Sequence, residues 1–385
     1  MTPKIAIIGA GPAGLTLASI LYRNGITSTV FESDESPSAR PQGGSLDLHP
    51  QTGQAALDAC GLTPQFKKYA RYDGQDLVLS DKHHNRLIQL KDTETGKPEI
   101  DRTQLRKILL DSLPEGVVRW NEHLVSATEE TLTFKTHVES GFDLIVGADG
   151  AWSKIRPLCC YVTPFYAGIT GIELVLNETS SKHSEISALV GNGSVFAMAS
   201  DDGRGLSFQR NDNDTIKCYA WSRRPEHWVK DGGLNWENRA EVCAVLKKDF
   251  GDWSPELTRI IDECDNTPTP RPLYMLPVGI RWPSQKKVTI IGDAAHLMTP
   301  FAGEGVNMAM ADGMDLAEAI IAQPDNIAAA IREMEPKMCE RATGAAGIAW
   351  ENTMLRFEPG GLKRTEDRFK RLFQKTQGKA GDDTH

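Results

Sequence analysis

The sequence lacks long hydrophobic runs and basic patches, and both absences exclude large classes of protein. No stretch of about 18 consecutive apolar residues occurs, so we expect no membrane-spanning helix. The net charge of -9 at pH 7, with no sustained basic patch before the charged C-terminal segment, argues against nucleic-acid binding. Hydrophobic content of 40% and charged content of 25% are those of a globular protein. The length of 385 residues exceeds one ordinary core, so we expect two domains.

The sequence also lacks any recognisable spacing pattern of cysteines. The seven cysteines are odd in number and form no CxxC pair or zinc-binding spacing. We therefore expect reduced, mostly buried thiols in a cytoplasmic protein. The adjacent Cys159 and Cys160 could form a redox pair, but a vicinal disulfide is strained, so ordinary packing is favoured.

A glycine-rich turn close to the N-terminus is the first motif that carries chemistry. It follows the apolar run 5–8, which is typical of a buried parallel strand, and precedes a helix with an apolar face that ends near Gly25. Such a turn lets the backbone approach a pyrophosphate at the helix N-terminus and lets the helix pack against the strand. The cofactor-binding residues expected here are Gly9, Gly11, Pro12, Ala13 and Gly14.

The next predicted strand, residues 28–31, ends at Glu32. A carboxylate at this strand end is suited to hold ribose hydroxyls and would repel a 2′-phosphate. We therefore expect the site to take FAD or NAD rather than NADP. A glycine turn without any nucleotide is the weaker interpretation, because the strand, the helix and the acidic residue are all in place.

A second motif, far along the chain, narrows the choice of nucleotide. An apolar run at 288–291 leads to Gly-Asp-Ala-Ala-His at 292–296, and a proline and a glycine-rich segment follow within 300–307. An aspartate at a buried strand end needs a polar partner. The two motifs together predict FAD, so that a redox cofactor rather than side chains would carry the chemistry. We find no catalytic triad or metal-binding cluster in the sequence.

The segments between these motifs predict an interrupted nucleotide-binding domain. Short apolar runs separated by polar turns predict strands that would form a substrate platform. We expect an α/β fold, with a Rossmann-like FAD-binding domain, an inserted antiparallel β-sheet substrate domain and a long C-terminal helix. The expected boundaries are 1–71, 101–165 and 275–325 for the FAD-binding domain, 72–100 and 166–274 for the substrate domain, and 326–385 for a C-terminal bridging helix and tail.

Three motifs occur in the order found in class A flavoprotein monooxygenases of the para-hydroxybenzoate hydroxylase fold. They are the turn at 9–14, Asp149-Gly150 at the end of a predicted strand, and Gly292-Asp293. The stretches 43–49 and 99–106 are also similar. The chain resembles this family over almost its whole length, and within the family it resembles the tetracycline-inactivating monooxygenases of the Tet(X) type.

The resemblance implies further cofactor contacts. Asp293 would hold the ribityl or ribose hydroxyls of FAD, and Asp47 and Arg102 would also contact FAD. NADPH or NADH would act transiently near Arg40, and Asp149 is associated with both cofactors. A solvated loop position for Arg40 and a turn-holding role for Asp149 stay open. The residues that would lie beside the isoalloxazine are Pro300, Gly303, Gly305, Val306 and Asn307.

The same resemblance implies a reaction. The enzyme would use NADPH or NADH and O₂ to hydroxylate an aromatic or polycyclic small molecule, tetracycline-like or a polyketide, through a flavin C4a-hydroperoxide. His296 would be structural. Alternatives are a flavin-dependent halogenase, whose WxWxIP signature is absent, a reductase on the same fold, or a non-catalytic flavoprotein that sequesters a small molecule. We expect a monomer.

The substrate residues are less specific than the cofactor motifs. Lys217 stands where the tetracycline-inactivating enzymes have a histidine, and Glu173 lies near the position of their glutamine. Val195 and Phe196 occupy the position of their arginine, and these departures weaken the case for tetracycline itself. For Phe208, core packing is an equal alternative. The candidate substrate-binding residues are Glu173, Phe208, Lys217, Met298, Phe301 and Gly303.

Overall fold

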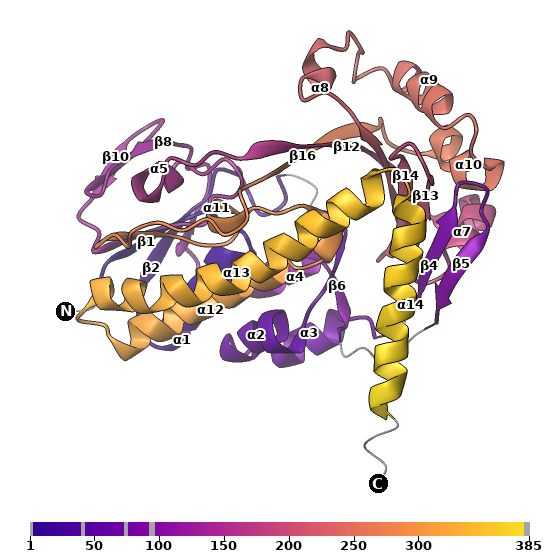
Figure 1. Ribbon diagram of the computed structural model, residues 1–385. Helices are drawn as coiled ribbons and strands as arrows, with labels where there is room; N and C mark the ends of the chain where they lie inside the picture. The colour runs from indigo at the N-terminus through magenta and orange to yellow at the C-terminus, as the bar shows by residue number, and fades with distance from the viewer. Residues whose placement is uncertain (1–2, 40–42, 73–75, 92–96, 381–385) are drawn as a thin grey trace. The chain divides into compact units, whose positions relative to one another are not determined.

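Two sheets dominate the computed structural model, which describes residues 3–39, 43–72, 76–91 and 97–380 (Figure 1). The chain divides into two compact units. Unit 1 comprises Met1–Arg71, Gly96–Phe165 and Tyr274–Trp350, and unit 2 comprises Tyr72–Thr95, Tyr166–Leu273 and Glu351–His385. The long helix α13 (Ile327–Phe357) therefore belongs to both units, and the segment expected as a separate C-terminal piece is divided between them.

Unit 1 is built on a five-stranded parallel sheet with the order β17-β11-β1-β2-β7. Its central strands read as continuous apolar runs because both faces of such a sheet are covered. The strands are β1 (Ile5–Ile8), β2 (Ser28–Phe31), β7 (Val118–Arg119), β11 (Leu144–Gly147) and β17 (Val288–Ile290).

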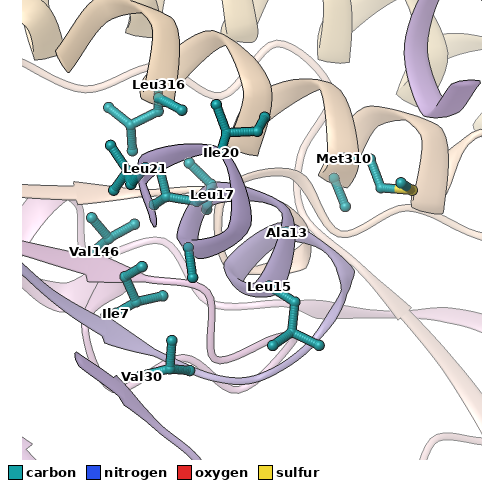
Figure 2. Close-up of a cluster of buried hydrophobic side chains, with 14 of the residues drawn as sticks. Ile7, Ala13, Leu15, Leu17, Ile20, Leu21, Val30, Val146, Met310 and Leu316 are labelled. Carbon is teal, nitrogen blue, oxygen red and sulfur yellow. The ribbon is translucent and has the colours of Figure 1, made fainter. Parts of the chain in front are cut away.

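Two helices pack closely against each other beside this sheet. Helix α1 (Pro12–Arg23) contacts α12 (Gly305–Ala322), and Figure 2 shows Leu17, Leu21 and Leu316 in the shared core with residues of the strands. Gly313 allows this approach, because a Cβ there would lie 2.6 Å from the carbonyl oxygen of Ala13. The helix start that holds the first glycine motif is thus fixed to the helix that follows the second one.

Smaller elements complete unit 1. A two-stranded antiparallel ribbon pairs β3 (Ser45–Asp47) with β6 (Glu99–Asp101), and a three-stranded sheet has the order β10-β9-β8. The remaining elements are the π-helix η1 (Pro50–Gln54), α2 (Ala55–Ala59), α3 (Thr63–Tyr69), α4 (Arg102–Asp111), β8 (Leu124–Ala127), β9 (Thr131–Phe134), β10 (Val138–Ser140), α5 (Arg156–Cys159), α11 (Asp293–His296) and the 3₁₀ helix η2 (Pro300–Ala302).

Unit 2 is built on a seven-stranded sheet with the order β16-β12-β15-β14-β13-β4-β5. The sheet is not purely antiparallel, because β13 and β4 pair in parallel. This pairing joins strands from two separate segments of the chain, which a hairpin pattern cannot predict. The strands are β4 (Leu77–Asp81), β5 (Arg86–Leu90), β12 (Phe165–Leu176), β13 (Ser194–Met198), β14 (Gly205–Asn211), β15 (Thr215–Arg223) and β16 (Thr269–Met275).

Helices cover the two faces of this sheet unequally. On one face α7 (Ser184–Val190), α9 (Arg239–Asp249) and α10 (Pro255–Glu263) pack in one apolar cluster with alternate strand residues. On the other face α14 (Gly361–Ala380) packs through Leu362 against Leu79 and Ile88. The short helices α6 (Thr179–Lys182) and α8 (Trp228–Asp231) lie in the connections.

The predicted fold class is confirmed: a Rossmann-like unit with a parallel sheet, a second unit with a largely antiparallel sheet, and a long C-terminal helix. Within the described ranges, none of the helices is long and apolar enough to cross a membrane. All seven cysteines are unpaired, and Cys160 is the half-buried one while the others are buried.

Candidate functional site

The glycine turn after β1 combines a tightly packed part with an open part. Gly9 has φ +109°, and a Cβ there would lie 2.3 Å from the carbonyl oxygen of Ala148. A Cβ on Gly14 would lie 2.1 Å from the carbonyl oxygen of Gly9. A Cβ on Gly11, by contrast, would meet no described atom within 4 Å. Two glycines are therefore required by packing, and Gly11 faces open space.

The same turn begins helix α1 with free backbone donors. Gly11 is the N-cap, Pro12 occupies the first turn, and no capping side chain or acidic residue of the described chain engages this end. The first amide groups of a helix lack internal partners and carry a partial positive charge. Open space in front of Gly11, with these donors beside it, suits a diphosphate.

Glu32, which follows β2, is hydrogen-bonded to the glycine turn after β1. Its Oε2 accepts a hydrogen bond from the Ala10 amide at 2.7 Å, and its Oε1 accepts one from the Asp34 amide at 2.9 Å. The Glu32 side chain is 9% exposed. Arg106, which the sequence reading missed, supports this corner from α4 by donating to Asp34 Oδ2 at 3.0 Å and to the Ala10 carbonyl at 3.3 Å.

The Asp-Gly motif after β11 places a carboxylate with one unused oxygen. Asp149 Oδ2 accepts from the Lys154 amide at 2.6 Å, whereas Oδ1 is buried without a hydrogen-bond partner among the described residues. Burial raises the pKa of this carboxyl above its ordinary value. Arg156 fastens the loop to the second motif, because it donates to the carbonyls of Ala151 and Ala294, both at 2.7 Å.

Asp293 begins helix α11 after Gly292, which has φ +62°. Its carboxylate is exposed to solvent and has no hydrogen bond or ion pair to any described residue. Protein nevertheless surrounds the group, and desolvation raises its pKa against the opposing pull of the positive charges on His296 and Arg102. An exposed carboxylate without a partner among the described residues can accept hydrogen bonds from ligand hydroxyls.

His296 and Asp312 form a buried pair behind this position. Nε2 of His296 lies 2.5 Å from Oδ2 of Asp312, which also accepts from the Gly292 amide at 2.9 Å, and Arg341 donates to Oδ1 at 2.9 Å. Burial lowers the pKa of His296, but the charge and hydrogen bond of Asp312, together with the charge of Asp293, outweigh it and the net shift is upward. Asp312 and Arg341 were missed in the sequence, because their spacing on two helices gives no local signal.

Asn307 joins the glycine-rich segment to the end of β3 and the residues after it through side-chain hydrogen bonds. Its Oδ1 accepts from the His49 amide at 2.8 Å, and its Nδ2 donates to the Asp47 carbonyl at 2.9 Å. Asn307 is fully buried, so its side chain is structural and only its backbone remains for a ligand. Gly303 has φ +70°, and a Cβ there would lie 3.5 Å from Asp47 Oδ1.

Four further candidate cofactor-binding residues lie in the described part of the chain, and a fifth does not. Gly305 and Val306 open α12, and no capping side chain of the described chain occupies its N-terminus. Pro300 begins η2 and is exposed. Arg102 is exposed at the start of α4, where its side chain passes Gly43 so closely that a Cβ there would lie 2.8 Å from its Cδ. Arg40 lies outside the described residues.

The candidate substrate residues separate into two groups. Met298, Phe301 and Gly303 belong to unit 1, and Met298 packs there in an apolar cluster with Ala349. Glu173 and Lys217 belong to unit 2, on strands β12 and β15. The two groups are therefore carried by different units.

Phe208 does not share the sheet face of Glu173. It pairs with Cys218, whereas Glu173 pairs with Tyr219, and adjacent strand residues point to opposite faces. Phe208 is 1% exposed in the cluster covered by α7, α9 and α10. The expected substrate contact of Phe208 is thus corrected to a core role.

Comparison with known proteins identifies the family. A family model described as an FAD binding domain matches residues 2–226 and 280–329. Monooxygenase penA of Penicillium thymicola is 31% identical, over 94% of this chain and 97% of that protein. The chain belongs to this family. This member is a flavin-dependent monooxygenase with FAD as its cofactor.

Solved structures of other proteins share the fold of this chain. HpxO of Klebsiella pneumoniae, complexed with FAD and uric acid, has a TM-score of 0.78 at 22% identity, covering 96% of this chain and 92% of that chain. Tetracycline destructase Tet(51) has a TM-score of 0.71 at 19% identity, covering 97% of this chain and 96% of that chain. The resemblance to the tetracycline-inactivating group therefore extends to the fold.

Proposed function

We propose that this flavin-dependent monooxygenase uses NADPH or NADH and O₂ to hydroxylate an aromatic or polycyclic small molecule. FAD supplies the redox chemistry when it is bound. The chain itself binds and orients the reactants and excludes water from them. We further propose that the protein is a monomer and is located in the cytoplasm. The unpaired thiols support that location.

Three of the proposed FAD contacts follow from groups that have room or lack partners. Gly11 and the start of α1 would bind the diphosphate, Asp293 would accept hydrogen bonds from hydroxyls, and the start of α12 would face the isoalloxazine. The remaining proposed contacts are Gly9, Pro12, Ala13, Gly14, Glu32, Asp47, Arg102, Asp149, Pro300, Gly303, Val306 and Asn307, with Arg40 proposed for the nicotinamide cofactor.

The observation that carries the substrate class is an aromatic group on one sheet face of unit 2. The rings of Tyr219 and Trp221 stack with centroids 5.1 Å apart, and Trp221 Nε1 donates to Ser207 at 3.0 Å. Gly171 makes room for the indole, because a Cβ there would lie 2.4 Å from the ring. Stacked aromatic surface favours a flat, ring-containing ligand.

Glu173 gives this aromatic face a polar preference. Its carboxylate accepts from the Tyr219 hydroxyl at 2.8 Å and from Arg271 at 3.1 Å. Burial raises the pKa of Glu173, but these two partners outweigh it, and the net shift is downward. An ionised carboxylate beside stacked rings favours a substrate with a phenolic O–H or ring N–H over one with its own carboxylate.

A screen of aromatic and polycyclic compounds tests the proposal. Purified protein carrying FAD should oxidise NADPH or NADH faster in the presence of a true substrate, with matching O₂ uptake. The product should gain one oxygen atom by mass spectrometry. Binding without O₂ uptake would instead indicate a sequestering flavoprotein, and a reduced or halogenated product would indicate the other activities of this fold.

A further inference from the structure

His49 lies between two carboxylates at a junction of the flavin-binding unit. Its Nε2 is 3.1 Å from Asp47 Oδ2, and its Nδ1 is 3.3 Å from Glu304 Oε1. The His49 side chain is 11% exposed, whereas the Asp47 side chain is 44% exposed and the Glu304 side chain is 24% exposed. The ring thus forms an enclosed bridge between two more accessible acids.

The bridge joins two segments that are distant in sequence. Asp47 ends β3, and Glu304 is the N-cap residue of α12. The backbones of the same segments are already joined by Asn307, which accepts from the His49 amide and donates to the Asp47 carbonyl. His49 therefore adds a side-chain bridge to the link that Asn307 makes, and together the two form a fastening between these segments. The bridge sets the position of the Asp47 carboxylate beside Gly303.

Both contacts of His49 require a doubly protonated ring. A neutral imidazole has one N–H donor and one lone pair, so one of its nitrogens would face a carboxylate without a proton. The charged form hydrogen-bonds to Asp47 and forms an ion pair with Glu304 at the same time, and these two acids raise the pKa of His49 to about 9. Burial and the charge of Lys97 oppose this shift. Asp47, Glu304 and Lys97 are the charged groups that act on the ring.

We propose that His49 is a positioning residue of the FAD site, whose doubly protonated ring holds Asp47 against the start of α12, and that FAD binding weakens when the ring loses one proton. The inference rests on the proposed placement of FAD at Asp47 and at the Gly303–Asn307 segment. The sign follows from linkage: the folded pKa lies above the ordinary 6.5, so the fastening is complete below pH 6.5 and is lost as pH rises through about 9.

The first test is the affinity of the apoprotein for FAD between pH 6 and pH 10, measured by quenching of flavin fluorescence. The wild-type dissociation constant should be nearly constant at neutral pH and should rise by up to roughly tenfold per pH unit above pH 9. The readout is binding rather than turnover, so it is independent of the substrate.

Two variants separate the charge of His49 from its bulk. His49→Gln cannot gain a proton, so its affinity should be weak at neutral pH and should not change with pH. Glu304→Gln keeps the histidine but removes one acid, so the pH at which affinity falls should move toward 6.5. The exposed His227 of unit 2 provides the control, because His227→Gln should reproduce the wild-type curve.

The outcomes are distinguishable. A wild-type affinity that is constant up to pH 10, or a Glu304→Gln curve that coincides with the wild-type curve, would overturn the role of His49. If His49→Gln does not fold, as judged by circular dichroism of the apoprotein, the Glu304→Gln curve decides alone. A wild-type protein that binds no FAD at any pH would instead contradict the cofactor assignment.

Discussion

Asp293 and Asp312 differ in what surrounds their carboxylates, although both act on the same histidine electrostatically. Asp312 is fully buried and accepts hydrogen bonds from Gly292, His296 and Arg341. Asp293 is exposed and has no partner among the described residues. The fully bonded Asp312 therefore holds the protein together, whereas Asp293, which protein desolvates without satisfying, is available for a ligand.

The glycines of the first motif repeat this contrast. A Cβ on Gly9 would collide with the Ala148 carbonyl, whereas a Cβ on Gly11 would enter open space. The fold requires Gly9, whereas packing leaves Gly11 free to have the ligand-binding role that we propose for it. The comparison therefore sorts motif residues into two roles that their spacing alone does not distinguish.

The largest effect is expected from Asp312→Ala. The variant leaves the buried His296 and the Gly292 amide without their acceptor and removes one of the two acids that pair with the half-buried Arg341, which should lower the free energy of unfolding by about 3–5 kcal/mol. Chemical denaturation of the apoprotein measures this change. Asp325→Ala, at an exposed position of the same unit, should leave the curve unchanged. A loss no larger than that of the control would show that Asp312 is not a structural centre.

The glycine pair should separate stability from binding. Gly9→Ala forces an L-residue to φ +109° and against Ala148, so the apoprotein should lose about 1–3 kcal/mol of stability. Gly11→Ala should leave the stability of the apoprotein unchanged and weaken FAD binding, because its methyl group enters the space proposed for the diphosphate. Thermal melts and FAD titrations of both variants measure this. Equal effects of both substitutions on stability would remove the distinction.

Asp293→Ala should affect the ligand and not the fold. Loss of hydrogen bonds to a charged acceptor should weaken FAD binding by about 10–100-fold. The melting temperature of the apoprotein should stay constant or rise, because desolvation already disfavours the charged carboxylate. Fluorescence titration with FAD and a melt of the same sample give both numbers. A lower melting temperature with unchanged FAD affinity would reverse the assigned role.

The smallest effect is expected in unit 2, from Glu173→Gln. The variant keeps the size of the side chain and removes the charge that would attract a substrate donor, so KM should rise by about tenfold with a smaller change in kcat. Steady-state kinetics with a compound from the screen measures the two constants. Glu237→Gln, at an exposed position of the same unit, is the control. An unchanged KM would place the substrate away from this sheet face.

The sequence predicted the strands of the parallel sheet of unit 1 and the glycine turns beside them because their signals are local. A strand buried on both faces must be apolar throughout, and a turn that passes another backbone must be glycine. The roles of Asn307 and His49 had no such signal, since their partners lie in segments far along the chain. Asn307 was expected near FAD through its backbone, and the structure adds the side-chain contacts.

Phe208 shows what the alternation of side chains along a strand cannot predict. Alternation along β14 correctly separates two sets of side chains, but it does not say which set the helices cover. That depends on α7, α9 and α10, which pack on the side of Phe208 and leave Glu173 on the other. The parallel pairing of β13 with β4 was equally invisible, because neither strand's own pattern specifies its neighbour.

By itself the sequence determined the central strands, the glycine turns beside them and, through two motifs that are each local, that the cofactor is a flavin dinucleotide. Tertiary structure alone decided which polar groups are left for a ligand. Asp312 and Asn307 are hydrogen-bonded to segments distant in sequence, whereas the Asp293 carboxylate has no such bond among the described residues. Only the folded chain brings those partners within hydrogen-bonding distance.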